Sequence, residues 1–379
     1  MRVAVFAGDL FWSSCPYEHL NVAHYLGQHC NADLVMFEDD IRLNKKFTGE
    51  EKFRFDPALF AQHPRLRTVK SWDELVSASS DYDALIANCK IAPKTRTPSM
   101  LGSKGAFKCP VVALDVGGTD QLTDCPHADI AVTKSPHWAD KVSEMWSIPA
   151  VALGCHQYDY YHLDTMRYGR RLQKQEFAEK YGVDPDRSLL IAPTNPNSHL
   201  DMYRIGMMTL DDVCRRFSDA GYSILVKTYP HDYVFREREA PMTGVYRRTS
   251  PHTNGLPQYE HLSKTHGLKV VESQDHHAAV SWCRYMYNMS GSHIGWETHF
   301  TGCRSFSIGY KKQSFFGRVT ARGRQFDVPD PYTTIDLDGC DKLPHVPARS
   351  GEDREAASVF MSDRVLVNSL PALLDWIEV

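Results

Sequence analysis

The sequence predicts an α/β protein made of two domains, each a doubly wound parallel sheet. Short apolar runs alternate with amphipathic helical stretches over residues 1–155, and the same alternation restarts over residues 186–350. Each run is apolar throughout and too short for a buried helix, as expected for a strand that is covered on both faces. Strand–helix–strand units of this kind build parallel sheets with helices on either side.

In the first domain, Pro16 opens a helix that runs to Cys30, because proline costs little at the first helical turn. Ser71 is expected to cap a helix over 72–78, and a Ser-Pro pair starts another over 136–146. The strands are expected at 2–7, 32–37, 67–70, 81–89, 109–118, 128–134 and 149–154. We predict no helix or strand for the charged segment 38–64.

Residues 156–185 are expected to connect the domains, with a helix around 172–182. In the second domain we expect Gly267 to end one helix as its C′ residue and Asp275 to cap the next. Helices are predicted at 197–220, 255–267, 275–283 and 292–302, and strands at 188–194, 222–230, 268–273, 285–290 and 303–310. The tail 351–379 ends in a helix that we expect to pack back on the N-terminal domain through Leu370, Leu373, Leu374 and Ile377.

The composition is that of a globular protein, with 42% hydrophobic and 24% charged residues. With 43 basic and 47 acidic side chains the net charge is −4, which argues against binding to nucleic acid by overall charge. No apolar run is long enough to span a membrane, and the first residues do not resemble a signal peptide. We therefore expect a cytoplasmic protein, or one in the host cytoplasm if the source is a virus.

Neither a metal nor a dinucleotide cofactor is expected. The 10 cysteines form no Cys-x-x-Cys pair and the 18 histidines are scattered, so reduced, mostly buried thiols and no metal site are predicted. The first strand is followed by Gly8-Asp9-Leu10-Phe11-Trp12 in place of Gly-x-Gly-x-x-Gly. The chain also lacks the Gly-x-x-x-x-Gly-Lys-Ser/Thr pattern of P-loop enzymes.

The most informative stretch is Tyr287–Glu297, in which a strand leads through small residues into a helix. The backbone N–H groups of Ser290, Gly291 and Ser292 would lie at the helix N-terminus, where they can hold a phosphate. Glu297, further along, could then accept hydrogen bonds from both hydroxyls of a ribose. The alternative is an ordinary strand–helix turn with Ser292 as the N-cap and Glu297 in solvent.

This stretch resembles the nucleotide-sugar motif in the C-terminal domain of GT-B-fold glycosyltransferases. The shared features are the small-residue turn at 290–292, Glu297, Gly302 and the strand at Ser305–Ile308. The pattern Ser-x-x-Gly-x-Glu looks most like capsule-polysaccharide and Kdo-type transferases, and Trp296-Glu297-Thr298 looks like the phage DNA glucosyltransferases. The resemblance implies a nucleoside-diphosphate sugar, for example a UDP-sugar, as donor, and two sheets that face each other across a cleft.

The end of the first domain is similar to the hinge of GT-B enzymes. A strand at 128–134 ends at Ser135, and a helix and a second strand then lead to Gly154 and the loop 155–161. The usual Asn-Gly-Val-Asp is absent, so the similarity is one of layout.

Other donor contacts are suggested by the ends of the second domain's strands. Lys227 belongs to Lys-Thr-Tyr-Pro-His, which looks like the Lys-x-His-Pro element of capsule and CDP-glycerol-type transferases, although His231 here follows the proline. Both side chains could neutralise a diphosphate, and Lys227 could equally lie in solvent. Thr194 and Asn195 follow the first strand, where GT-B enzymes place donor-phosphate contacts, but these residue types are also common in loops.

Asp115, at the end of the strand VVALD, is the candidate general base of an inverting transferase. Its position matches that of the proposed base in the phage DNA glucosyltransferases. The alternatives are Asp9 and Asp120, or a turn role for Asp115 before Gly117-Gly118. The acceptor is expected near the loop after the first strand, with Phe11, Trp12 and His19 as candidate contacts that could equally be packing residues.

Residues 310–324 carry basic side chains interleaved with aromatic ones and no acid, a pattern suited to an anionic polymer. Lys311, Lys312 and Arg318 are therefore candidate acceptor contacts, unless this is a solvated loop.

Taken together, these features of the sequence predict a metal-independent glycosyltransferase that acts on a saccharide or on a modified base in DNA. The alternatives are a CDP-linked polyol-phosphate transferase, a sugar-nucleotide epimerase of the same fold, and a non-catalytic nucleotide-sugar-binding protein.

Overall fold

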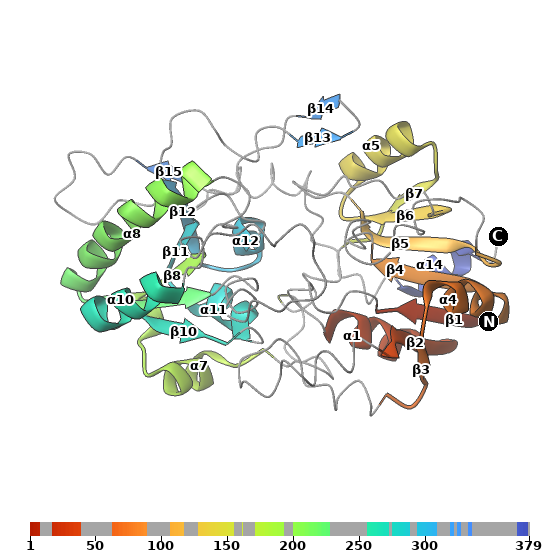
Figure 1. Cartoon of the computed structure of the whole chain (residues 1–379), viewed down its shortest axis with the longest axis horizontal. Helices are drawn as coiled ribbons and strands as arrows, with labels where there is room; N and C mark the ends of the chain where they lie inside the picture. Colours follow the sequence, from red (N-terminus) through yellow and green to blue (C-terminus); the bar gives the residue numbers. More distant parts are fainter. Residues whose placement is uncertain are drawn as a thin grey trace. The chain divides into compact units, whose positions relative to one another are not determined.

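The computed structural model describes residues 1–7, 17–38, 63–88, 107–116, 128–154, 161, 171–192, 200–227, 256–272, 275–288, 294–308, 319–321, 324–326, 333–335 and 370–377. The chain divides into two compact units (Figure 1). The first comprises Met1–Arg170, Ala321–Gly323 and Glu355–Val379. The second comprises Arg171–Thr320 and Arg324–Arg354.

The first unit is built on a seven-stranded sheet in the order β3-β2-β1-β4-β5-β6-β7, with every adjacent pair parallel. The order reverses between β1 and β4, as in the doubly wound sheets that bind nucleotides. The strands are β1 (Arg2–Phe6), β2 (Asn31–Phe37), β3 (Leu66–Val69), β4 (Ala84–Asn88), β5 (Val111–Val116), β6 (Ile130–Thr133) and β7 (Ala150–Ala152).

Both faces of this sheet are buried. Successive side chains of a strand point to opposite faces, and those of β1 belong to two different apolar clusters. Val3 and Val5 lie in one apolar cluster with α1 (Tyr17–Leu26) and the C-terminal helix α14 (Leu370–Ile377), whose Leu373 and Leu374 are buried there. Ala4 and Phe6 lie in the other cluster, with α4 (Trp72–Ala78). Helix α5 (Pro136–Trp146) packs on β6 and β7.

The N-terminus of α4 is capped by side chains close to it in the sequence. The Oγ atom of Ser71 accepts a hydrogen bond from the N–H of Glu74 at 3.2 Å, and the Glu74 side chain accepts one from the N–H of Lys70 at 2.7 Å. These bonds satisfy donors that a helix start otherwise leaves unpaired. The predicted N-cap at Ser71 is therefore confirmed, and a 3₁₀ turn at Ser79–Asp81 (η1) follows the helix.

Asp33 on β2 is a buried carboxylate held by three donors. Its Oδ2 atom accepts hydrogen bonds from Arg2 Nη2 at 2.7 Å and from the hydroxyl of Tyr82 at 3.0 Å, and its Oδ1 atom accepts one from Arg65 Nε at 2.6 Å. Burial raises the pKa of Asp33, but these hydrogen bonds outweigh it and hold the pKa below the ordinary value. The network ties β2 to β1 and to the segments before β3 and β4.

The second unit contains a six-stranded sheet in the order β10-β9-β8-β11-β12-β15, again with parallel neighbours throughout. The prediction of two doubly wound parallel sheets is confirmed. The strands are β8 (Ser188–Ala192), β9 (Ser223–Lys227), β10 (Lys269–Val271), β11 (Tyr285–Asn288), β12 (Arg304–Ile308) and β15 (Thr333–Ile335). A separate two-stranded sheet pairs β13 (Val319–Ala321) with β14 (Arg324–Phe326).

Helices α8 (Leu200–Asp219) and α10 (Leu256–His266) share an apolar cluster with β8, β9, β11 and β12, in which Phe217 stacks on Phe306. Gly267 ends α10 at φ +65°, a backbone conformation that favours glycine, so its predicted role is confirmed. Helix α7 (Lys174–Tyr181) packs against α11 (His276–Trp282). The remaining helical segments are η3 (Pro185–Arg187), α12 (Ile294–Glu297) and η7 (Thr298–Phe300).

Among the described cysteines, Cys30, Cys109, Cys214, Cys283 and Cys303 are free thiols, and all except Cys30 are buried. Burial raises the pKa of Cys109 to about 11 and those of Cys214 and Cys283 to about 12, so these thiols are protonated at neutral pH. No helix in the described part of the chain is both long and apolar enough to cross a membrane.

Candidate functional site

The carboxyl edge of the second sheet brings polar side chains together. Lys227 is the last residue of β9, α11 begins shortly after β10, and α12 follows β11. Because all these strands are parallel, their carboxyl ends meet at one edge of the sheet. The order of the strands reverses between β8 and β11, and an open α/β sheet binds its ligands at such a point.

The start of α11 is held by α7, a helix that lies much earlier in the chain. Asp275 occupies the predicted N-cap position, but its side chain makes no capping hydrogen bond. Its Oδ2 atom instead accepts hydrogen bonds from Lys180 Nζ at 2.7 Å and from the hydroxyl of Tyr181 at 2.5 Å. Asp275 therefore occupies the predicted position, but the predicted capping hydrogen bond is wrong. Its carboxylate binds two donors from α7 and not the backbone N–H groups of α11.

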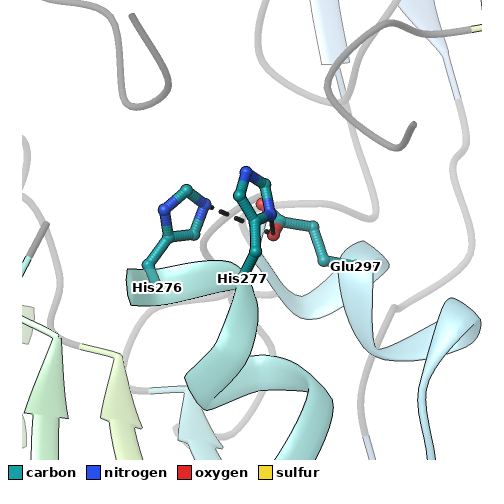
Figure 2. A group of neighbouring side chains, drawn as sticks. All are labelled: His276, His277 and Glu297. Atoms are coloured by element: carbon teal, nitrogen blue, oxygen red, sulfur yellow. Dashed lines mark ion pairs between the residues drawn. The ribbon is translucent and has the colours of Figure 1, made fainter. Parts of the chain in front are cut away.

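Two adjacent histidines follow Asp275 and meet Glu297 (Figure 2). The Nε2 atom of His276 lies 3.7 Å from Oε2 of Glu297, and the Nδ1 atom of His277 lies 3.6 Å from the same oxygen. The two imidazole centroids are 3.7 Å apart. All three side chains are buried, and Glu297 retains only 10% of its side-chain exposure. Glu297 is thus not the solvated residue that the alternative interpretation expected.

The charges of two cations act on this cluster at His277. Burial holds the pKa of His277 well below its ordinary value, and the charges of His276, Lys227 and Arg171 lower it further. His277 is therefore neutral at neutral pH. Glu297 is an acidic residue in a buried region where Lys227 and Arg171 supply two cations, so the site is suited to an additional anion.

Arg171 is fixed by contacts with α11. Its Nη1 atom donates a hydrogen bond to Ser281 Oγ at 3.2 Å, and that hydroxyl donates to the carbonyl oxygen of His277 at 2.6 Å. The guanidinium also lies over the Trp282 ring, 5.3 Å from its centroid, while the indole N–H donates to the Leu172 carbonyl. The cation is thereby held close to the histidines.

The helix predicted at 292–302 is shorter in the structure. It consists of one α-helical turn, α12, and the 3₁₀ turn η7, with Thr298 Oγ1 donating to the Gly295 carbonyl at 2.6 Å. Glycine and β-branched residues in this stretch disfavour a longer helix. A helix this short has a small dipole, so the electrostatic argument for a phosphate at its N-terminus is weaker than expected.

The other predicted site residues are spread over both units. Asp115 is the next-to-last residue of β5, as its sequence position implied. His19 lies in the first turns of α1 and is buried, with 3% of its area exposed. Further candidates lie outside the described residues: Asp9, Phe11, Trp12, Asp120, Thr194, Asn195, His231, Ser290, Gly291, Ser292, Lys311, Lys312 and Arg318.

His276, His277 and Arg171 were not predicted from the sequence as site residues. A His-His pair at the start of a helix that follows a strand is the signal that could have drawn attention to the first two. Their proximity to Glu297 could not be inferred from spacing, because β11 lies between them in the chain. Within the described part of the chain, His276, His277 and Glu297 form a group whose ligand atoms all lie within 4.8 Å of one another, a group able to hold a metal ion.

No protein-family model matches the sequence, and no curated protein matches it. Solved structures do match over the whole chain. A variant of the wall teichoic acid polymerase TagF has a TM-score of 0.56 at 13% identity, over 100% of this chain and 88% of that one. The chain has a GT-B fold. That fold consists of two doubly wound domains, and the cluster of His276, His277 and Glu297 lies in the second of them.

Two further structures have the same architecture. The UDP-GlcNAc 2-epimerase from Methanocaldococcus jannaschii has a TM-score of 0.54 at 8% identity, over 99% of this chain and 100% of that one. Os79 from O. sativa, solved in complex with UDP, has a TM-score of 0.53 at 9% identity, over 99% of this chain and 100% of that one. At such identities the likeness concerns the fold, so the activity has to be argued from the residues.

Proposed function

We propose that this protein is a glycosyltransferase that moves a sugar from a nucleoside-diphosphate sugar to an acceptor hydroxyl. The observation that carries the proposal lies at the carboxyl edge of the second sheet. There the buried carboxylate of Glu297 lies 3.6 Å from His277, and the charges of Lys227 and Arg171 act on that same histidine. Such a combination matches the two halves of the ligand, since ribose hydroxyls donate hydrogen bonds and a diphosphate carries negative charge.

In this proposal, Glu297 accepts hydrogen bonds from the ribose. Lys227 and Arg171 neutralise the diphosphate and stabilise the charge that develops on it as it leaves. Additional donors for the phosphates are the backbone of Ser290–Ser292 and the side chains of Thr194, Asn195 and His231. Charge stabilisation of this kind requires preorganised cations, which the contacts of Arg171 with Ser281 and Trp282 provide.

The acceptor half of the reaction is assigned to the first domain. Asp115 acts as the general base and removes the proton from the acceptor hydroxyl as its oxygen attacks the anomeric carbon. Asp9 and Asp120 are the alternative bases. Phe11 and Trp12 would stack on a saccharide or on a base of DNA, whereas the burial of His19 in α1 favours a packing role for that residue.

A sugar-nucleotide epimerase is the second candidate, and one observation favours it. His276 and His277 lie within 4 Å of the Glu297 carboxylate, so three groups able to transfer protons are concentrated at one point. An epimerase would use such groups to move a proton on the sugar, whereas a transferase needs a base beside the acceptor.

Incubation of the full chain with a panel of radiolabelled nucleotide sugars, followed by chromatography of the products, tests the proposal. A glycosyltransferase releases nucleoside diphosphate, with the sugar transferred to an acceptor or slowly to water. A new nucleotide sugar with its diphosphate intact would identify an epimerase instead. Retention of a donor without any product would identify a binding protein, and the absence of both binding and turnover would refute the proposal.

A further inference from the structure

We propose that His276, His277 and Glu297 bind a divalent transition metal ion such as Zn²⁺ or Co²⁺, and that a nucleoside diphosphate bound beside them strengthens its binding. The first part stands on the geometry of the three side chains alone. The second part rests on the proposed function, because it takes the diphosphate as the neighbouring ligand.

The distances around Glu297 favour a shared ion. Both histidine contacts converge on one carboxylate oxygen, at 3.7 Å and 3.6 Å, which is too long for hydrogen bonds. A tetrahedral ion with bonds of about 2.0–2.1 Å holds its ligand atoms about 3.3–3.4 Å apart. The two histidine–carboxylate separations therefore exceed those around a bound ion by only a few tenths of an ångström, and all three ligand atoms lie within 4.8 Å of one another. Two imidazoles and one carboxylate also form a ligand set that zinc enzymes use with one position left open.

The surroundings fix the ligands before an ion arrives. His276 and His277 are neighbours in the first turn of α11, whose start is tied to α7 through Asp275, Lys180 and Tyr181. The Ser281 hydroxyl bonds to the His277 carbonyl one turn further on. Each of the three ligand side chains has 10% or less of its surface exposed. A preorganised set of this kind loses little conformational freedom when it binds an ion.

The nearby charges determine what the fourth ligand should be. Glu297 contributes one negative charge to the ligand set, and a dication would leave that set with a net positive charge next to Lys227 and Arg171. The repulsion weakens the binding of the metal alone. An anionic oxygen at the open position relieves it, and the diphosphate of the proposed donor supplies such an oxygen. The metal and the nucleoside diphosphate should therefore strengthen each other's binding by the same factor.

The test is a titration of the chelator-treated full chain with Co²⁺, with and without UDP, followed by visible absorption spectroscopy. We expect one Co²⁺ per chain with ligand-field bands, and an affinity at least about tenfold higher when UDP is present. His276→Ala, His277→Ala and Glu297→Gln should each abolish the bands, with folding checked by circular dichroism. His261→Ala, which alters an exposed histidine beside Asp211, is the matched control and should leave the bands unchanged.

Wild-type protein that gives no bands under either condition would overturn the metal site, as would bands that persist in all three folded variants. Calorimetry with UDP alone separates this result from the proposed function. If UDP binds and Co²⁺ does not, the metal inference fails and the nucleotide site stands. If Co²⁺ binds through the three side chains and no nucleoside diphosphate binds, the metal site stands while the coupling and the proposed function fail.

Discussion

The hydroxyl of Tyr181 donates a hydrogen bond to the carboxylate of Asp275, the residue immediately before His276. The same hydroxyl accepts a hydrogen bond from the backbone N–H of Glu272 at 3.1 Å. Burial and the negative charge of Asp275 raise the pKa of this phenol, so it remains a donor at every physiological pH. The side chain therefore links α7 to both ends of the turn that presents the two histidines.

Tyr181→Phe should destabilise the protein by about 1.5–3 kcal/mol, the range for a hydrogen bond to a charged group. It should also weaken binding of the donor, because α11, which holds Arg171 through Ser281 and Trp282, loses an anchor, while Glu297 stays chemically intact. Urea unfolding and calorimetry measure the two effects. Lys174→Ala, on the same helix as Tyr181, removes an exposed ion pair with Asp186 in η3 and should change neither quantity appreciably. Equal effects of both substitutions would show that the Tyr181 contact has no special role.

Asp33→Asn should lower the free energy of unfolding at neutral pH by about 3 kcal/mol, because Arg2 and Arg65 lose the carboxylate between them. The folded-state pKa of Asp33 lies below its ordinary value of 3.8. The contribution of the carboxylate is therefore complete above that value and is lost as the pH falls through the folded pKa. Urea unfolding across pH should show the difference between wild type and variant narrowing only in acid. A difference independent of pH would contradict this account.

Asp115→Asn should reduce turnover by at least about 100-fold, the usual effect of losing a general base, while donor affinity stays within a few-fold. The amide keeps the size of the side chain but cannot accept the proton. Steady-state kinetics and donor titration of the same preparation measure both quantities. Normal turnover in the variant would transfer the role to Asp9 or Asp120, or indicate a retaining mechanism.

Simultaneous neutralisation of Lys311, Lys312 and Arg318 tests whether the acceptor is DNA. If these side chains contact phosphates, DNA binding weakens steeply with salt, and the triple variant should reduce the slope of log K against log salt by about three. Donor binding should be unchanged. Gel-shift titrations at two salt concentrations provide the measurement, and the absence of any shift by the wild type at low salt would rule out a DNA acceptor.

The fold could be predicted from the sequence because the apolar runs are local signals. Val3 and Val5 face one layer of helices while Ala4 and Phe6 face the other, so a run apolar at every position indicated burial on both sides. The strand β15 was not predicted, because Thr333-Thr334-Ile335 is short and largely polar. This strand pairs with β12 at the edge of the sheet, and a local sequence pattern does not reveal such a long-range contact.

The site was only partly predictable, because contacts between segments that are distant in the chain leave no local signal in the sequence. Glu297 was found through a motif, but its histidine neighbours come from the preceding helix and meet it only after the chain has passed through β11. Asp275 fits the local rule for an N-cap, yet two donors from α7 outcompete the backbone for its carboxylate. In both cases contacts between distant segments decided the outcome.

Calorimetric titration of the full chain with a panel of nucleoside diphosphates tests the central claim, that the second sheet carries a nucleotide site built on Glu297. At least one nucleotide should bind to the wild type, and Glu297→Ala should weaken that binding by about tenfold to one hundredfold, as expected for the loss of charged hydrogen bonds worth about 1.5–3 kcal/mol. Lys264→Ala, at the far end of α10, serves as a surface control and should bind like the wild type. Unchanged affinity in a folded Glu297→Ala variant, or no binding of any nucleoside diphosphate to the wild type, would contradict the account.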